Sequence, residues 1–341
     1  MNSLAKRAAL VGSLVVLGIA ALGWLWVFYG PNDFDGSGQK LVTISRGQTF
    51  QEIVDSLEAQ RVIRSRAMFE FVARVFGGTD RIQVGRYAFQ QGTSNATIYL
   101  TLRDGTENML IPVIVPEGTM SRTQARIYRR VIGIDSAAFM RLAFDPSFAR
   151  SLGIDAPSLE GYLLPDTYSF YWQQDERDIL RTMASAFLEF YGDSLRAKAE
   201  AIGWSMKKVV TIASIVEGEA VLDEERPVIA GVYLNRLRIG MRLEADPTIQ
   251  YVVPGGPRRL MYSDLRFDSP YNTYRNYGLP PGPVNNPGRS SIHAVLHPAR
   301  HNFIFFVANG KGGHWFSSTY AEHLRFVKRY RRERSRTPST G

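Results

Sequence analysis

The pattern of apolar and polar positions divides the chain into an uncharged first segment, a short mixed segment and a long, mainly helical remainder. Residues 8–29 carry no charge and end in tryptophan, phenylalanine and tyrosine. Because roughly 20 apolar residues cross a bilayer, we predict a transmembrane anchor here. Lys6 and Arg7 precede this segment and acidic residues follow it, so the positive-inside rule places residues 1–7 in the cytoplasm and the rest outside. A cleaved signal peptide is the alternative, although the uncharged run exceeds a signal-peptide core and no small-x-small cleavage site accompanies it.

After a polar linker at residues 30–40, residues 41–108 alternate between strand and helix patterns. Thr49 and Glu52 form a capping box at the start of a helix. The elements predicted by the pattern are, in chain order, a strand at 41–44, two helices, a strand at 85–89 and a helix at 95–102. This order predicts a small α+β subdomain.

Helical periodicity dominates residues 109–324, with short strands such as the one predicted at 109–116. Ser121 and Gln124 repeat the capping-box spacing before a second helix, and residues 179–202 read as a long amphipathic helix. The loop at 159–168 is dense in aromatic residues, glycine, proline and acids, which favours a role beyond connecting elements. Residues 325–341 form a basic tail.

The helix predicted after Ser205 is the strongest candidate for chemistry, because an apolar arc at helical spacing ends in two carboxylates. Glu217 lies on one shoulder of the arc and Glu219 on the other, and periodicity does not choose between them. A carboxyl on an apolar wall has a raised pKa and holds a proton near neutral pH, as a general acid must. The alternative is a buried glutamate that is satisfied by an arginine.

Charge and cysteine content exclude several other classes. The net charge is +9, but most of the excess lies in the first seven residues and in the tail, so the body is nearly neutral. This distribution argues against an extended nucleic-acid surface. The chain has no cysteine, which excludes disulfides, thiol nucleophiles and Cys-ligated metals and suits an exported bacterial protein.

Several motifs beyond the glutamate helix carry a resemblance to a known family. These motifs are Glu224 to Pro227, Val232 to Leu243, Asp246 to Thr248, Ser269 to Tyr274, Gly278 to Pro283 and Gly312 to Ser317. The loop at 159–168 and the segment from Ser214 to Glu217 belong to the same set. Together, and in this order, they closely resemble the YceG-like (MltG) family of endolytic lytic transglycosylases. The order of elements in 41–108 resembles a LysM module, although a purely architectural role is equally open.

The resemblance implies a single-pass enzyme of the inner (cytoplasmic) membrane with a periplasmic catalytic domain at 109–324. It implies cleavage of nascent peptidoglycan strands between N-acetylmuramic acid and N-acetylglucosamine, and association with penicillin-binding cell-wall synthases. The family's catalytic glutamate maps onto Glu217, and Glu219 matches a second family position. No cofactor is expected.

One glutamate suffices for this reaction, because the muramic acid supplies its own nucleophile. The acid protonates the bridging oxygen, then removes the proton of the C6 hydroxyl as that oxygen closes on C1 and leaves a 1,6-anhydro end. Amides, carboxylates and phenols that can support the sugar are Asn235, Asp246, Tyr271, Asn272 and Tyr274. Each of them also has a structural interpretation as a turn or core residue.

His293, His297 and His301 recur every four residues, but Pro298 interrupts the helix they would need, so we predict no metal site. Two other functions stay open. A muramidase would use water and leave reducing ends, whereas a non-catalytic scaffold would bind glycan strands without releasing product.

Overall fold

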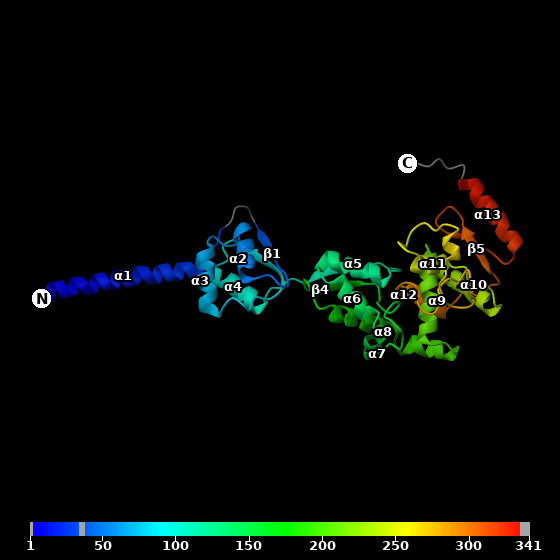
Figure 1. Cartoon of the computed structure of the whole chain (residues 1–341), viewed down its shortest axis with the longest axis horizontal. Helices are drawn as coiled ribbons and strands as arrows, with labels where there is room; N and C mark the ends of the chain where they lie inside the picture. Colours follow the sequence, from blue (N-terminus) through cyan, green and yellow to red (C-terminus); the bar gives the residue numbers. More distant parts are fainter. Residues whose placement is uncertain (1–2, 34–37, 335–341) are drawn as a thin grey trace. The chain divides into compact units, whose positions relative to one another are not determined.

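The structure is a computed structural model that describes residues 3–33 and 38–334, and it divides into two compact units. Unit 1 contains the chain up to Pro112 together with Ser169–Gln174, and unit 2 contains Val113–Tyr168 and the chain from Asp175 onward (Figure 1). Helices and short strands occur in both units, so the predicted α+β class is confirmed.

Unit 1 follows the predicted order of strand, helix, helix, strand and helix. Its elements, after the N-terminal helix α1 (Ser3–Tyr29), are β1 (Gln39–Ile44), α2 (Phe50–Ala59), α3 (Arg66–Phe76), β2 (Gly85–Gln90) and α4 (Asn95–Asp104). β1 and β2 pair antiparallel, with Gln39 opposite Gln90 and Ile44 opposite Gly85. Similarity to a LysM module stays a prediction.

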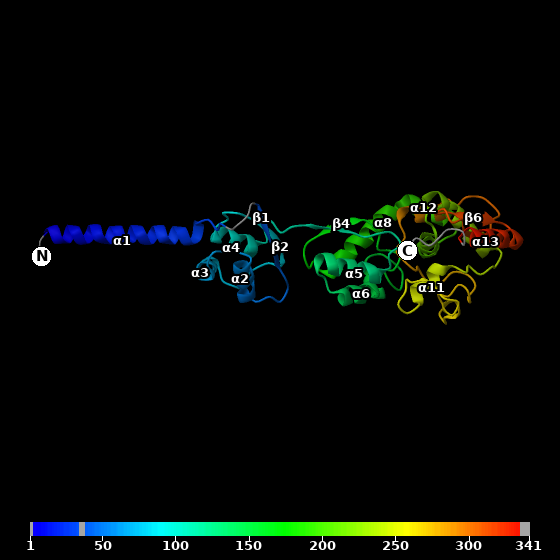
Figure 2. The ribbon, with the colours of Figure 1, turned by 90° about the horizontal axis from the view of Figure 1, so that it is seen from above.

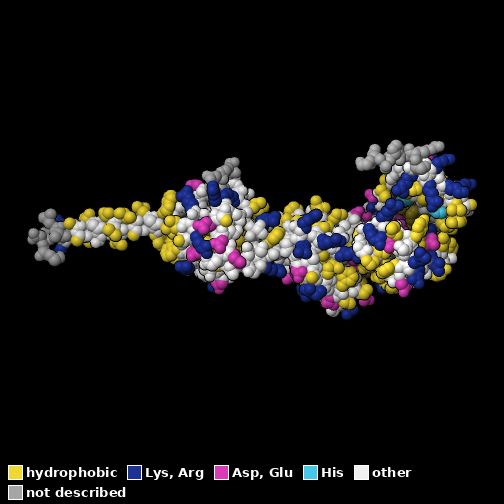
Figure 3. All heavy atoms as spheres, turned by 45° about the horizontal axis from the view of Figure 1, so that its top comes forward, with side chains coloured by type: hydrophobic (Ala, Val, Ile, Leu, Met, Phe, Trp, Pro, Cys, Tyr) yellow, Lys and Arg dark blue, Asp and Glu magenta, His cyan; other side chains and the backbone are white. Residues whose placement is uncertain are grey.

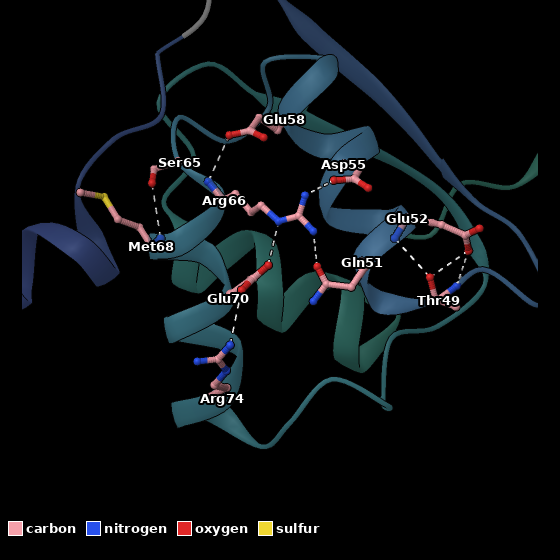
Figure 4. Close-up of polar contacts among 10 residues, drawn as sticks. All are labelled: Thr49, Gln51, Glu52, Asp55, Glu58, Ser65, Arg66, Met68, Glu70 and Arg74. Atoms are coloured by element: carbon pink, nitrogen blue, oxygen red, sulfur yellow. Dashed lines mark hydrogen bonds and ion pairs between the residues drawn. The ribbon is translucent and has the colours of Figure 1, made fainter.

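Local polar contacts in unit 1 explain where its helices begin (Figure 4). The predicted capping box at α2 is confirmed: the Thr49 backbone N–H donates to the Glu52 carboxylate at 2.7 Å, and the Glu52 N–H donates to the Thr49 hydroxyl at 3.3 Å. At the start of α3, the hydroxyl of Ser65 accepts the N–H of Met68. Arg66 on α3 then donates to Asp55 on α2, which ties the two helices together.

α1 is long and apolar enough to span a membrane, and its last turn belongs to the core of unit 1. Phe28 is fully buried in this core, and the Asn95 side-chain amide donates to the carbonyl of Val27 at 3.0 Å. Asn32, within the predicted linker, is also buried and donates to Asn95 at 3.0 Å. The start of the predicted linker is therefore held against unit 1, and residues 34–37 lie outside the described residues.

Unit 2 is mainly helical, as predicted (Figure 2). The remaining short strands pair β3 with β4 and β5 with β6, and both β3 and β4 contain residues of each unit. The first half of the elements that follow α4 comprises β3 (Ile111–Ile114), α5 (Ser121–Ile132), α6 (Ser136–Ala143), α7 (Pro146–Ser151), β4 (Thr167–Phe170), α8 (Glu176–Ala201) and α9 (Met206–Glu219). The second half comprises α10 (Arg226–Arg238), α11 (Asp246–Val252), α12 (Arg289–Leu296), β5 (Phe305–Ala308), β6 (His314–Ser317) and α13 (Tyr320–Arg334), with 3₁₀ turns at Asp223–Glu225 and Asp264–Arg266.

α9 is the predicted helix with the two carboxylates, and it lies in the middle of unit 2. The hydroxyl of Ser205 accepts the N–H of Lys208 at 3.2 Å, so the predicted N-cap is confirmed. Every residue from Val209 to Val216 is buried, because α9 packs against α10, α11 and α12. A helix that is apolar on nearly all sides must be surrounded by other elements.

One prediction about the start of a helix is wrong. Ser121 is not a side-chain cap, since α5 begins after Met120 without a capping hydrogen bond; the Ser121 N–H donates instead to Glu160 at 3.0 Å.

The basic tail predicted at 325–341 begins within a helix, because α13 runs from Tyr320 to Arg334. Trp315 stacks on Phe326 of α13 at 5.5 Å, so the first part of the basic tail is packed helix. Residues 335–341 of the tail lie outside the described residues.

Candidate active site

Glu217 lies at the C-terminal end of α9, and one of its carboxylate oxygens is held by three donors. Oε2 accepts from the backbone N–H of Gly288 at 3.0 Å, from the hydroxyl of Ser291 at 2.7 Å and from Nη1 of Arg226 at 3.0 Å. The side chain of Glu217 is only 6% exposed and that of Arg226 only 8%. Glu217 therefore has the arginine partner that the sequence analysis gave as the alternative for a buried glutamate.

The second oxygen of Glu217 is not restrained in this way. Within residues 3–33 and 38–334, no hydrogen bond to Oε1 is present, and Oε1 faces the loop at Gly118. Gly118 has a φ of +70°, and a side chain there would come within 3.3 Å of the Glu217 side chain. A glycine at this position is suited both to the left-handed backbone and to the close approach. Glu217 thus has one oxygen held by three donors and one oxygen without a hydrogen bond from the described residues.

Glu117 is a site residue that the sequence analysis missed. Its carboxylate lies so close to Gly288 that any side chain at Gly288 would overlap with it, and Arg226 is 4.0 Å away. Partial burial, followed by the negative charge of Glu217, raises the pKa of Glu117. The only signal in the sequence was an acid between the end of a predicted strand and a glycine.

A buried polar network holds the loops around Glu217 in place, and Asn286 is its centre. The Asn286 side-chain oxygen accepts from the N–H groups of Gly161 and Leu163, at 2.8 and 3.1 Å. Its amide donates to the Thr119 carbonyl and to the Glu160 carboxylate, both at 3.0 Å. The predicted functional loop at 159–168 is therefore joined to the segments before α5 and before α12. Burial raises the pKa of Glu160 to about 7.

Glu219, on the other shoulder of α9, belongs to a separate cluster. It accepts from the hydroxyl of Tyr233 at 2.9 Å, while Tyr274 donates to the nearby Asp246 at 2.6 Å. Desolvation raises the pKa of Glu219 to about 7, and the charge of Asp246 adds to this shift. The raised pKa predicted for a carboxyl at the end of this helix is thus found at Glu219.

A cavity of about 430 Å³ in unit 2 is lined by Glu219 and by Gly118, which adjoins Glu217, whereas Glu217 is not one of its lining residues. Thr119, Asp246 and Asn285 also line this cavity. A neighbouring cavity of about 830 Å³ shares Asp246 and adds Tyr274 and the segment from Arg258 to Tyr262.

The structure brings together only some of the predicted sugar contacts. Glu219, Asp246 and Tyr274 are close to one another and line the cavities. Asn235 is not at this site, because its amide donates to the carbonyls of His301 and Phe303, both at 2.9 Å.

Asn272 and Tyr271 also have structural roles. Asn272 is fully buried and its amide donates to the carbonyls of Leu265 and Phe267 at 3.0 and 2.7 Å, as expected for an asparagine that shapes a turn. Tyr271 is partly buried, with its ring 5.0 Å from that of Tyr251.

The three spaced histidines do not converge. The ring of His293 contacts Phe190, whereas Nε2 of His301 is 3.0 Å from the carbonyl of Val228. Across the parts of the chain that the structure describes, no group of three or more histidines and carboxylates is placed to hold a metal ion.

Comparisons with known proteins agree with the motifs. The sequence profile of the YceG-like family matches residues 42–329. An endolytic murein transglycosylase of Bacillus subtilis (strain 168) is 30% identical over 318 residues, which cover 88% of this chain and 87% of the relative. An endolytic murein transglycosylase of Streptococcus pneumoniae (strain ATCC BAA-255 / R6) is 27% identical, and the match covers 94% of this chain and 65% of the relative. A crystal structure of a YceG-like protein from Listeria monocytogenes matches with a TM-score of 0.61 and 30% identity, over 84% of this chain and 98% of that chain. The chain therefore belongs to the YceG-like family.

Proposed function

We propose that this protein is a membrane-anchored lytic transglycosylase that cuts peptidoglycan strands internally and leaves 1,6-anhydro-N-acetylmuramic acid ends. The family, and relatives named endolytic murein transglycosylases, support a peptidoglycan substrate. The observation that carries the mechanism is the asymmetric environment of Glu217. Oε2 is fixed by Arg226, Ser291 and Gly288, so Oε1 is the oxygen that can serve the reaction.

In this proposal, Oε1 of Glu217 donates its proton to the oxygen that bridges N-acetylmuramic acid and N-acetylglucosamine. The bond from C1 to that oxygen breaks, and the C6 hydroxyl of the muramic acid attacks C1 while Oε1 takes up its proton. Arg226 stabilises the carboxylate that exists between these two transfers. The proton returns to Glu217, and no water is consumed.

Glu219, Asp246 and Tyr274 would contact the sugars on the other side of the cavity. Glu219 with a pKa near 7 can donate a hydrogen bond to a sugar oxygen while it is protonated. The pair of Asp246 and Tyr274 presents an acceptor and an aromatic ring beside the larger cavity. We do not propose Asn235 and Asn272 as sugar contacts, because their side-chain amides donate to backbone carbonyls.

The location of the enzyme is part of the same proposal. Residues 8–29 of α1 would cross the inner membrane with residues 1–7 in the cytoplasm and both units in the periplasm. Penicillin-binding synthases are proposed as partners, because an anchored enzyme of this kind acts where new strands are made. Crosslinking in membranes that recovers the protein repeatedly without any such synthase would contradict this partnership.

The decisive experiment compares two matched variants of the purified full chain on uncrosslinked glycan strands, with products weighed by mass spectrometry. Glu217→Gln keeps the shape and hydrogen bonding of the side chain but removes the transferable proton, so cleavage should fall by about 10²–10⁴-fold. Glu219→Gln should retain most of the activity. Loss in Glu219→Gln with near-normal anhydro product from Glu217→Gln would assign the chemistry to the other carboxylate.

The same products separate the two alternative functions. Reducing N-acetylmuramic acid ends from the unmodified protein would identify a water-using muramidase. Glycan binding that is equal in the unmodified protein and in Glu217→Gln, without product from either, would identify a scaffold.

A further inference from the structure

Helix α3 of unit 1 has a second apolar face that no part of the described chain covers completely. Its inner face packs into the core through Phe69, Val72 and Ala73, which are buried. On another side, Met68, Phe71 and Val75 are 38%, 45% and 52% exposed. We refer to these three residues as the outer face of α3. Their spacing of three and four residues places them in one stripe along the helix.

The charged residues of α3 lie on a different side. Arg66 donates to Glu70 at 2.9 Å, and Arg74 donates to the same carboxylate at 3.4 Å. Arg66 also reaches Asp55 on α2, so this charged stripe follows the side of α3 that faces α2 (Figure 4). The outer face is therefore separate both from the core and from the salt-bridged surface of the helix.

The outer face adjoins the last turns of α1. The ring of Phe71 is 5.8 Å from that of Phe28 in an edge-to-face arrangement, and Trp24 stacks on Phe28 at 4.2 Å. Figure 4 shows the Met68 side chain extending toward α1, and Figures 1 and 2 both place α3 at the end of unit 1 that adjoins α1. In the space-filling view of Figure 3, hydrophobic side chains gather where α1 meets unit 1.

The length of α1 sets the depth of this region. The uncharged part of α1, residues 8–29, has 22 residues, which span about 33 Å, against about 30 Å for the hydrocarbon core of a bilayer. The last turn of α1 therefore reaches the outer boundary of the membrane, where Trp24, Trp26 and Tyr29 are suited to the headgroup region. Because Phe28 of this same turn is buried in the core of unit 1, no spacer separates unit 1 from that boundary.

From this continuity we propose that the outer face of α3 lies in the outer headgroup region of the bilayer that α1 crosses, and that it docks unit 1 on the lipid. The partner is the bilayer itself, and the inference rests on the proposed anchor. A helix in the plane of the interface buries its apolar stripe in the headgroup and acyl boundary. Docking at both α1 and α3 would hold unit 1 in one orientation at the membrane, instead of on a single flexible tether.

The absence of cysteine allows a direct test with single-cysteine variants of the full chain. Each variant carries an environment-sensitive fluorophore and is reconstituted into phosphatidylcholine vesicles that contain nitroxide-labelled lipid, with the nitroxide either at the headgroup or deep in the acyl chain. Met68→Cys and Val75→Cys report on the outer face. Leu17→Cys reports on the middle of α1, and Gln48→Cys is the control. Gln48 is exposed and precedes Thr49, which Figure 4 places on the far side of unit 1 from α1.

Docking predicts blue-shifted emission at positions 68 and 75, with quenching by headgroup nitroxide that exceeds that at position 48 by about threefold or more. The probe at position 17 should be quenched by the deep nitroxide. If the probe at 17 responds but those at 68 and 75 behave like the one at 48, the docking inference is wrong while the anchor stands. If the probe at 17 is not quenched, the proposed anchor fails and the docking inference fails with it.

Discussion

Replacing Glu219 by glutamine should change how the stability of the protein depends on pH. Glu219 is partly buried at the end of α9, and its carboxylate accepts from Tyr233. Desolvation raises its pKa from 4.5 to about 7, so the folded protein binds this proton more tightly than the unfolded chain does. Between pH 4.5 and about pH 7 the free energy of unfolding decreases as the pH rises, because the folded protein must release this proton from a desolvated carboxyl.

The size of the effect follows from the shift. A difference of one pKa unit corresponds to 1.36 kcal/mol, so the shift of Glu219 amounts to about 3 kcal/mol across the window from pH 4.5 to pH 7. The contribution is fully present below pH 4.5 and is lost above pH 7. Glutamine has the shape of the protonated acid and does not titrate, so Glu219→Gln should keep this stability at every pH.

The assay is denaturant unfolding of the full chain in detergent at a series of pH values from 4.5 to 8.5. The difference in free energy of unfolding between Glu219→Gln and the unmodified protein should move by about 3 kcal/mol in favour of the variant as the pH rises. Glu160, whose pKa is also raised to about 7, is present in both proteins and cancels. Glu224→Gln removes an exposed carboxyl nearby and is the control. A difference that stays constant from pH 5 to pH 8 would refute the reasoning, since Glu219 would then be ionised throughout.

Two further predictions concern the surroundings of Glu217. Gly288→Ala would place a methyl group where the Glu117 carboxylate lies and displace that carboxylate from its position near Arg226. We expect the rate of glycan cleavage to fall at least about tenfold with the circular dichroism of the fold preserved, and unchanged kinetics would contradict this. Asn286→Ala removes the five hydrogen bonds of this side chain, so the free energy of unfolding should fall by about 3 kcal/mol or more, measured by denaturant titration. A loss below about 1 kcal/mol would show that the network does not hold the loops.

The sequence alone determined the elements whose signals are local. Thr49 and Ser205 mark helix starts because a capping hydroxyl bonds to an N–H only a few residues away. The apolar run of α1 and the buried arc of α9 follow from hydrophobic spacing alone. The same local logic failed at Ser121, where the first N–H of α5 is satisfied by Glu160, a residue in a distant loop.

Only the tertiary structure decided how the two carboxylates of α9 differ. Periodicity places Glu217 and Glu219 on opposite shoulders of one helix, and nothing within α9 distinguishes them. Arg226 and Ser291 reach Glu217 from α10 and α12, whereas Tyr233 and Asp246 surround Glu219 from α10 and α11. Charge and desolvation depend on which groups the fold brings near a carboxyl, and long-range packing determines those neighbours.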